Sequence, residues 1–165
     1  MEINPYQPPS AVPVSMPGGD QLAGYGARLV AVIIESLTLL PITLPLAFAM
    51  GNFDGILEGR QPPLLNTIAM TVLGYGVFVA INWVFLKNGQ TIGKRAMGIR
   101  IVALDGSVLP VGRLLTMRYL PWWITSVIPV IGGILVLIDA LFIFRHDRRC
   151  IHDHIAGTKV VAVTR

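Results

Sequence analysis

Two carboxylates lie inside long apolar stretches of the sequence, where charged side chains are rare. Glu35 lies within RLVAVIIESLTLL, residues 28–40, and Asp139 lies within GILVLIDALFIF, residues 133–144. A carboxylate at the centre of a membrane helix costs about 2.5 to 3.5 kcal/mol, so it should face a protein interior or water and have a partner. Arg28 precedes Glu35 by about two helical turns, roughly 10 Å along the same face. Two acids near an arginine could therefore form a pathway for protons or cations.

The same acids also have a purely structural interpretation. With Asn66 and Asn82, they would be the polar groups of an otherwise apolar helix bundle. Each polar contact between membrane helices adds about 1 kcal/mol, so such groups can hold helices together without any transport. The sequence alone leaves both interpretations open.

A nucleotide site and a metal site both have weak support. The segment GQTIGKR, residues 89–95, is similar to a phosphate-binding loop, but its glycine spacing is one residue short. Arg95 also stands where a Ser or Thr would contact magnesium. His146, His152 and His154 lie near two aspartates, yet no third ligand follows at a spacing that completes a metal site. We expect a structural turn there instead.

The sequence does not predict an enzyme. No nucleophile, general base and orienting acid occur at spacings that would assemble a catalytic site, so neither catalytic residues nor a cofactor is expected. The single cysteine, Cys150, excludes an internal disulfide and any metal site with several cysteines. The net charge of +4 does not indicate nucleic acid binding, because the basic residues flank apolar blocks instead of alternating with aromatic residues on a polar face.

The composition is typical of an integral membrane protein. Of the 165 residues, 53% are hydrophobic and 13% are charged, and the mean hydropathy is +0.66. The apolar residues form blocks long enough to cross a bilayer, which takes about 20 helical residues. We therefore expect an all-α integral membrane protein with four hydrophobic helical segments, at about 28–49, 64–86, 111–128 and 132–145.

A proline-rich tail and a small β element complete the expected fold. The tail, residues 1–23, contains five of the twelve prolines and is expected to be disordered and cytoplasmic, ahead of a membrane domain at 24–163. A strand is expected at 99–104, and it can pair with a second strand at 159–164 in a hairpin-like element on the cytoplasmic side.

The distribution of Lys and Arg indicates the topology, because these residues mark the cytoplasmic loops. Arg60 is the one basic residue between the first two apolar blocks, whereas 87–118 holds six and 145–165 holds five. A single span over 111–144 would put the last two groups on opposite sides, but a hairpin that turns at 129–133 puts both, and both termini, in the cytoplasm. We favour the hairpin, whose arms of about 16 residues reach only about 24 Å and should be tilted or re-entrant.

A basic loop defined by Lys94, Arg95 and Arg100 follows the second apolar block. Each basic residue at the headgroup layer gains about 1 kcal/mol from anionic lipid, so the expected partner of this loop is the bilayer surface. A chain this small would also need a homo-oligomer or a larger membrane partner to enclose a transport pathway.

Three motifs follow one another along the chain. They are Gly26-Ala27-Arg28 with an acid seven residues later, GQTIGKRAMGIRIVALDG at 89–106, and IHDHIAGTKVV at 151–161. In this order they resemble the RDD family of bacterial membrane proteins, which is named for one arginine and two aspartates. The resemblance covers residues 24–163 and implies a multi-pass protein of the bacterial inner membrane.

The family residues can be matched one at a time. The resemblance implies that Arg28 is the family arginine and that Glu35 stands where the first aspartate falls. Asp153, in the pattern His-Asp-x-x-Ala-Gly-Thr, corresponds to the second aspartate, with Asp139 as the alternative. Glutamate in place of aspartate suits a proton carrier or a salt bridge better than a tight ion site, because the side chain is one methylene longer. Asp153 would lie outside the membrane, where it can pair with Lys94, Arg95 or Arg28.

The resemblance carries no established molecular activity, and transport is suggested by charges placed in the membrane. Our first hypothesis is ion or proton transport that uses Glu35. The alternative is a non-catalytic membrane adaptor or assembly protein that recruits partners through its tail or its basic loop.

Overall fold

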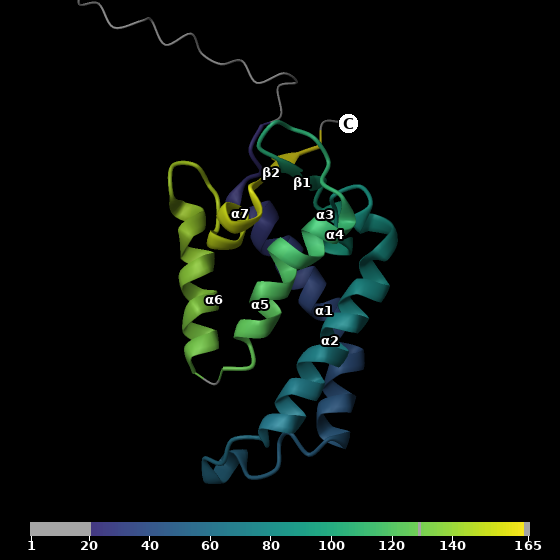
Figure 1. Cartoon of the computed structure of the whole chain (residues 1–165), viewed down its shortest axis with the longest axis vertical. Helices are drawn as coiled ribbons and strands as arrows, with labels where there is room; N and C mark the ends of the chain where they lie inside the picture. Colours follow the sequence, from purple (N-terminus) through teal and green to yellow (C-terminus); the bar gives the residue numbers. More distant parts are fainter. Residues whose placement is uncertain (1–20, 129, 164–165) are drawn as a thin grey trace, which may run out of the picture.

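The computed structural model describes residues 21–128 and 130–163, apart from the side chain of Ile56, and two long helices dominate it (Figure 1). Helix α1, Tyr25–Ala49, and helix α2, Leu64–Leu86, run in opposite directions and are joined by a turn-rich segment that includes the 3-10 helix η1, Ile56–Glu58. Both helices are long and apolar enough to cross a membrane. They confirm the predicted helices in these two regions and the mostly helical fold.

The apolar side chains of α1 and α2 face outward over most of their length. Leu29, Leu37 and Phe48 of α1 and Leu65 and Val72 of α2 are each more than half exposed. A continuous apolar surface of this size is unfavourable in water, whereas helices in lipid present such a surface because the lipid tails around them are apolar as well. The two helices therefore have the surface of membrane segments and not of buried core helices.

The last apolar region, residues 111–144, forms a helical hairpin. Its first arm is continuous through α4, Val111–Arg113, the π-helical segment η2, Leu114–Tyr119, and α5, Leu120–Thr125. Its second arm is α6, Ile131–Leu141, followed by the 3-10 turn η3, Phe142–Phe144. The prediction placed these arms at 111–128 and 132–145; the helical residues are 111–125 and 131–144.

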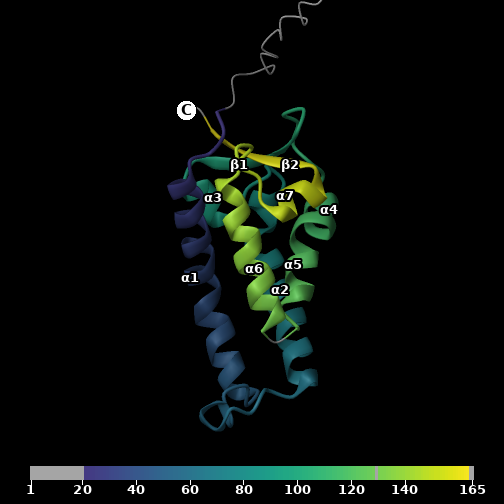
Figure 2. The same ribbon diagram turned by 90° about the vertical axis from the view of Figure 1, so that its left-hand side faces the viewer.

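Two residues explain the shape of this hairpin. Pro121 has no N–H and its ring crowds the carbonyl one turn earlier, which accounts for the widened π-helical turn just before it. Gly132 allows the reversal, because a β-carbon there would collide with the carbonyl oxygen of Thr125. As a result α5 and α6 lie side by side (Figures 1 and 2). The Trp122 indole Nε1 donates to Asp139 Oδ2 at 2.9 Å.

A two-stranded antiparallel sheet closes one end of the helices, opposite the end that carries η1 (Figure 2). Strand β1, Ile99–Ala103, pairs with strand β2, Thr158–Ala162, with Ile101 opposite Val160. The predicted pairing of these two segments is confirmed. Of the predicted tail, residues 1–20 lie outside the described residues, and its last three residues run beside β2, where Ala23 N–H donates to the Val160 carbonyl at 3.0 Å.

Two short helices pack under the sheet. Helix α3, Ile92–Ala96, lies against α1, and helix α7, Ile151–Ala156, lies against η2. The approach of α3 to α1 depends on Gly93, because a β-carbon there would collide with the Ala31 carbonyl oxygen and lie 2.9 Å from Glu35 Cγ. The sheet, α3 and α7 together form what we call the cap, and the functional residues predicted from sequence belong to it or to the segments of α1 and α6 that face it.

Candidate functional site

Asp153 lies at the centre of a buried ion cluster beneath the cap. Arg28, from the first turn of α1, donates from Nη2 to Asp153 Oδ2 at 2.6 Å. Arg118, from η2, donates from Nη1 both to Asp153 Oδ1 and to Thr158 Oγ1, the latter at 2.6 Å. Asp153 is completely buried, and both arginines are less than a tenth exposed. A single carboxylate therefore joins two guanidinium groups, and we call this set the Asp153 cluster.

The carboxylate of Asp153 is saturated by further hydrogen bonds. Oδ2 also accepts from the Cys150 backbone N–H at 3.2 Å, which caps the first turn of α7, and Oδ1 accepts from Thr158 Oγ1 at 3.1 Å. Arg28 additionally donates to the carbonyl oxygen of Arg148. The sequence offered Lys94, Arg95 and Arg28 as partners for Asp153, and of these three Arg28 forms the ion pair. Each carboxylate oxygen of Asp153 accepts two hydrogen bonds, so the arrangement is suited to holding α1, η2 and α7 together.

Arg118 was not predicted as a site residue. It lies in the apolar block at 111–128, so a charge inside a hydrophobic stretch, the same signal that identified Glu35, could have found it. In the topology prediction, Arg118 was instead one of the six basic residues of the segment 87–118 that was placed in the cytoplasm. Its burial makes it a partner of Asp153 rather than part of a basic surface.

Glu35 forms a second ion pair, separate from the Asp153 cluster. Lys94 Nζ lies 2.8 Å from Glu35 Oε1, and Thr91 Oγ1 donates to the same oxygen. In the described part of the chain both hydrogen bonds to Glu35 are accepted by Oε1. The sequence had suggested that Arg28 points toward Glu35, but Arg28 is bound to Asp153, and Lys94 takes its place because Gly93 brings α3 against α1.

The basic loop is only partly a basic surface. Lys94 is 8% exposed and is bound to Glu35, so it does not lie on the open face that the sequence suggested. Arg95 is exposed and donates to Gln90 Oε1 at 3.4 Å, and Arg100 is half-buried on β1. Asn82 completes this corner, because its Oδ1 accepts from the Ile92 backbone N–H at 2.8 Å at the start of α3.

Asp139 binds a third group of residues. His152 Nδ1 lies 2.7 Å from Asp139 Oδ2, and the His152 backbone N–H donates to Oδ1 at 3.0 Å. With the Trp122 indole, three donors converge on this side chain, which is therefore an acceptor-only carboxylate. Burial lowers the pKa of His152 to about 4, so at neutral pH the ring is uncharged and its Nδ1–H donates to the Asp139 carboxylate.

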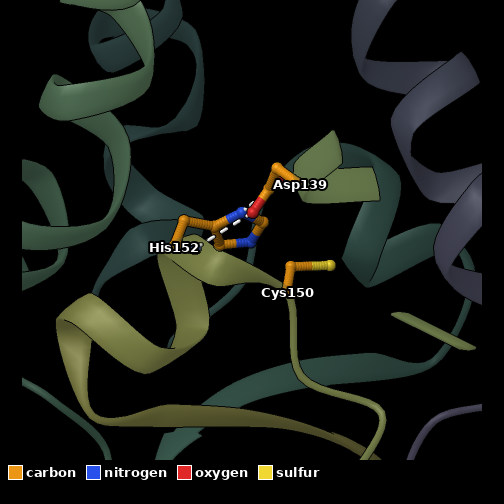
Figure 3. A group of neighbouring side chains, drawn as sticks. All are labelled: Asp139, Cys150 and His152. Carbon is orange, nitrogen blue, oxygen red and sulfur yellow. Dashed lines mark hydrogen bonds and ion pairs between the residues drawn. The ribbon is translucent and has the colours of Figure 1, made fainter. Parts of the chain in front are cut away.

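Cys150 lies beside this pair, as Figure 3 shows. Its Sγ, an Asp139 carboxylate oxygen and a His152 ring nitrogen all lie within 4.8 Å of one another. Burial raises the pKa of the Cys150 thiol, which is therefore protonated at neutral pH. No third ligand near the histidines was apparent from the sequence, and in the structure Asp139 comes close to His152 from α6.

One cavity connects these groups. It has a volume of about 500 Å³ and lies between α1 and the hairpin, below the cap. Glu35, Lys94 and Arg28 line it on the α1 side, and Asp139 and His152 line it on the other. Arg118 and Cys150 also line it, and the remaining wall is mostly apolar, with side chains of α1, α5, α6 and η3. The arrangement can therefore bring a proton or an ion to two acids from different helices that line one cavity.

Comparison with known proteins gives a consistent result. The family model described as "RDD family" matches residues 22–157. A protein of Bacillus subtilis (strain 168) named "Uncharacterized protein YckC" is 33% identical over 144 residues, which cover 86% of this chain and 85% of that protein. An "Uncharacterized protein" of Haemophilus influenzae is 31% identical over 141 residues, 81% of this chain and 74% of that one. No solved structure matches. With a family model over most of its length and a relative of this similarity, the chain belongs to the RDD family.

Proposed function

We propose that this protein is a multi-pass membrane protein of the bacterial inner membrane that moves a proton or a small cation, with Glu35 as the carboxylate that exchanges it. One observation carries the proposal. Glu35 lines the cavity of about 500 Å³ while its hydrogen bonds occupy Oε1, which leaves the second oxygen available to an incoming ion. A carboxylate held in this way is bound firmly enough to be stable and is still able to change its partner.

The exchange follows from competition for one negative charge. Lys94 neutralises Glu35 in the resting pair. A proton or a cation that binds Glu35 neutralises the carboxylate. The electrostatic attraction between Lys94 and Glu35 is then lost, and Lys94 can move away. The positive charge of Lys94 is then uncompensated. When the ion departs, this charge draws Lys94 back to the ionised Glu35 and restores the resting pair.

The second acid of the cavity supports the same proposal. Asp139 belongs to the apolar arm α6, and its carboxylate shares a proton with the neutral His152 ring. A proton that binds at Nε2 of this ring makes it an imidazolium, whose Nδ1 proton can then pass to the carboxylate. Glu35 and Asp139 therefore give the cavity two positions at which a proton or cation can be held.

The proposed orientation puts the cap in the cytoplasm. Arg60 lies in the connection that carries η1, at the end remote from the sheet, whereas the two segments 87–118 and 145–165 hold eleven of the thirteen basic residues. Helices α1 and α2 cross the bilayer. The hairpin arms, with 15 and 14 helical residues, span only about 21 to 23 Å at 1.5 Å per residue and therefore enter the membrane without crossing all of it. A second copy or another membrane protein completes the path on the far side.

The test uses the purified protein in liposomes that contain a pH-sensitive dye. An imposed sodium or potassium gradient should drive proton flux in the natural protein, and Glu35→Gln should abolish it, because the amide cannot exchange a proton or neutralise Lys94. Glu58→Gln is the matched control, since Glu58 is an exposed acid that pairs with Arg60 at the other end of the molecule. Gel filtration and circular dichroism show that each variant is folded.

Two results would count against the proposal. Flux that Glu35→Gln leaves unchanged would remove Glu35 from the mechanism. Absence of flux in the folded natural protein under every imposed gradient would favour the adaptor hypothesis, for which crosslinking of a partner that is lost on deletion of residues 1–20 is the direct measurement.

A further inference from the structure

Asp139, Cys150 and His152 supply three different metal-ligating atoms at one place. They come from α6, from the residue just before α7 and from the first turn of α7, and their ligand atoms all lie within 4.8 Å of one another (Figure 3). A thiolate, an imidazole nitrogen and a carboxylate oxygen together suit a divalent ion of borderline softness such as Zn²⁺, whereas Mg²⁺ and Ca²⁺ prefer oxygen ligands alone. We propose that these three residues bind a divalent transition-metal ion of the zinc type, with its fourth position open to the cavity.

The burial of the ligands favours this site. Asp139 and Cys150 are 4% and 6% exposed, so both have already lost most of their contact with water in the folded chain. Three protein ligands with one open position is the pattern of zinc sites that bind a water molecule or a substrate, in contrast to structural sites, which are closed by four protein ligands. The open position here faces a cavity of about 500 Å³ that is large enough for such a ligand.

Binding requires the ligand atoms to rearrange, and Cys150 Sγ, which lies within 4.8 Å of the other two ligand atoms, must approach the ion with them. His152 Nδ1 and Asp139 Oδ2 are now 2.7 Å apart and share a proton. Two ligands at ordinary zinc distances in a tetrahedron are about 3.4 Å apart, so the ion would replace the shared proton and separate the two side chains by less than an ångström. The ring proton moves from Nδ1 to Nε2, and the Cys150 thiol releases its proton to solvent, so one proton leaves for each ion bound.

The charges around the site limit what occupies the fourth position. Arg28 and Arg118 carry two positive charges, which Asp153 and Asp139 balance in the metal-free state. A divalent ion together with the Cys150 thiolate adds one net positive charge to this balance. An anionic fourth ligand, such as hydroxide, restores neutrality, and nearby guanidinium groups favour an anion at that position.

Cobalt is the probe for this site, because Co²⁺ replaces Zn²⁺ and gives a near-ultraviolet absorption band when a thiolate binds it. The full chain, purified in detergent without a polyhistidine tag and treated with a chelator, is titrated with Co²⁺. The expected result is one equivalent bound with a thiolate-to-cobalt band, which added Zn²⁺ abolishes. Cys150→Ser should remove the band, and His152→Gln should weaken binding at least about tenfold.

His154→Gln is the matched control. His154 lies on the same short helix, but its Nε2 is 3.1 Å from Asp147 and it is not part of the ligand set. It should bind Co²⁺ like the natural protein. The proposal is overturned if the natural protein binds no Co²⁺ at micromolar concentration, if bound Co²⁺ gives no thiolate band, or if His154→Gln weakens binding as much as His152→Gln does. Because the first two outcomes are measured on the natural chain, they do not depend on whether any variant folds.

Discussion

Two acids of this protein have a basic partner beneath the cap, but their surroundings differ. Asp153 is completely buried, accepts hydrogen bonds at both oxygens and binds two arginines that lie 125 and 35 residues away in the chain. Glu35 has one lysine partner, accepts its hydrogen bonds at one oxygen and faces the cavity. The saturated acid is suited to fixing the fold, and the partly saturated one is suited to exchange.

Arg28 and Asp153 lie together in the structure, whereas Glu35 lies apart from them. Arg28 and Asp153 join the first helix to the last one, and Arg118 adds the hairpin to the same point. Removing one member of a buried ion pair costs much more than the pair contributes, because the charge left behind is uncompensated. The two acids should therefore respond very differently to the same chemical change.

The largest effect is expected for Asp153→Asn. The amide keeps the shape of the side chain but leaves Arg28 and Arg118 buried without a negative partner, so the free energy of unfolding should fall by about 3 to 5 kcal/mol. This is a large part of the total for a domain, which is about 5 to 15 kcal/mol. Thermal unfolding of the protein in detergent, or the yield of folded protein if the variant is too unstable, measures the loss.

Asp147→Asn is the control for that prediction, because Asp147 is a partly exposed aspartate outside the cluster. A second variant keeps the test informative if the first does not fold. Combining Asp153→Asn with Arg118→Met removes one buried positive charge together with the carboxylate and should recover part of the lost stability. Equal unfolding temperatures for Asp153→Asn and Asp147→Asn would show that Asp153 is not the centre of the fold.

An intermediate effect is expected for Gly93→Ala, which acts on the Glu35 pair through packing. The added methyl group would collide with the Ala31 carbonyl and lie 2.9 Å from Glu35 Cγ, so α3 must move away from α1 and carry Lys94 with it. Overpacking of this kind costs about 1 to 3 kcal/mol. We expect lower thermal stability and impaired proton flux in liposomes, with the Asp153 cluster still intact.

Gly112→Ala is the matched control for this change, since a β-carbon at Gly112 meets no atom within 4 Å. It should leave both the unfolding temperature and the flux close to those of the natural protein. If Gly93→Ala behaves like Gly112→Ala, the close approach of α3 to α1 does not position Lys94, and the distinction between the two acids must rest on something else.

The sequence predicted the parts of this molecule that local chemistry determines. Length and apolar content identified α1 and α2, and a charge inside an apolar block identified Glu35 and Asp139. The pairing of β1 with β2 was also predictable, because both segments have strand patterns and lie in basic regions expected on one side of the membrane.

The contacts that the sequence could not supply all join distant segments through steric details. Lys94 reaches Glu35 across 59 residues because Gly93 permits a close helix contact. Asp139 reaches Trp122 because Gly132 allows the chain to reverse before α6. Neither glycine carries a local pattern that states which backbone it will approach, so the partners of both acids became known only from the structure.

The smallest effect is expected for Glu58→Gln, which extends the comparison to a third acid. Glu58 Oε2 lies 2.6 Å from Arg60 Nη2, a distance as short as that between Arg28 and Asp153, but both side chains are about two-thirds exposed. Water stabilises the two separated charges almost as well as the ion pair does. An exposed pair therefore contributes at most about 1 kcal/mol to the free energy of unfolding. The unfolding temperature should change little, and raising the salt concentration should remove the remaining difference, since exposed charges are screened.

A loss of stability as large as that of Asp153→Asn would mean that the distance within an ion pair, and not its burial, determines the cost of removing one member. The contrast between the saturated acid and the exchanging acid would then lose its physical basis.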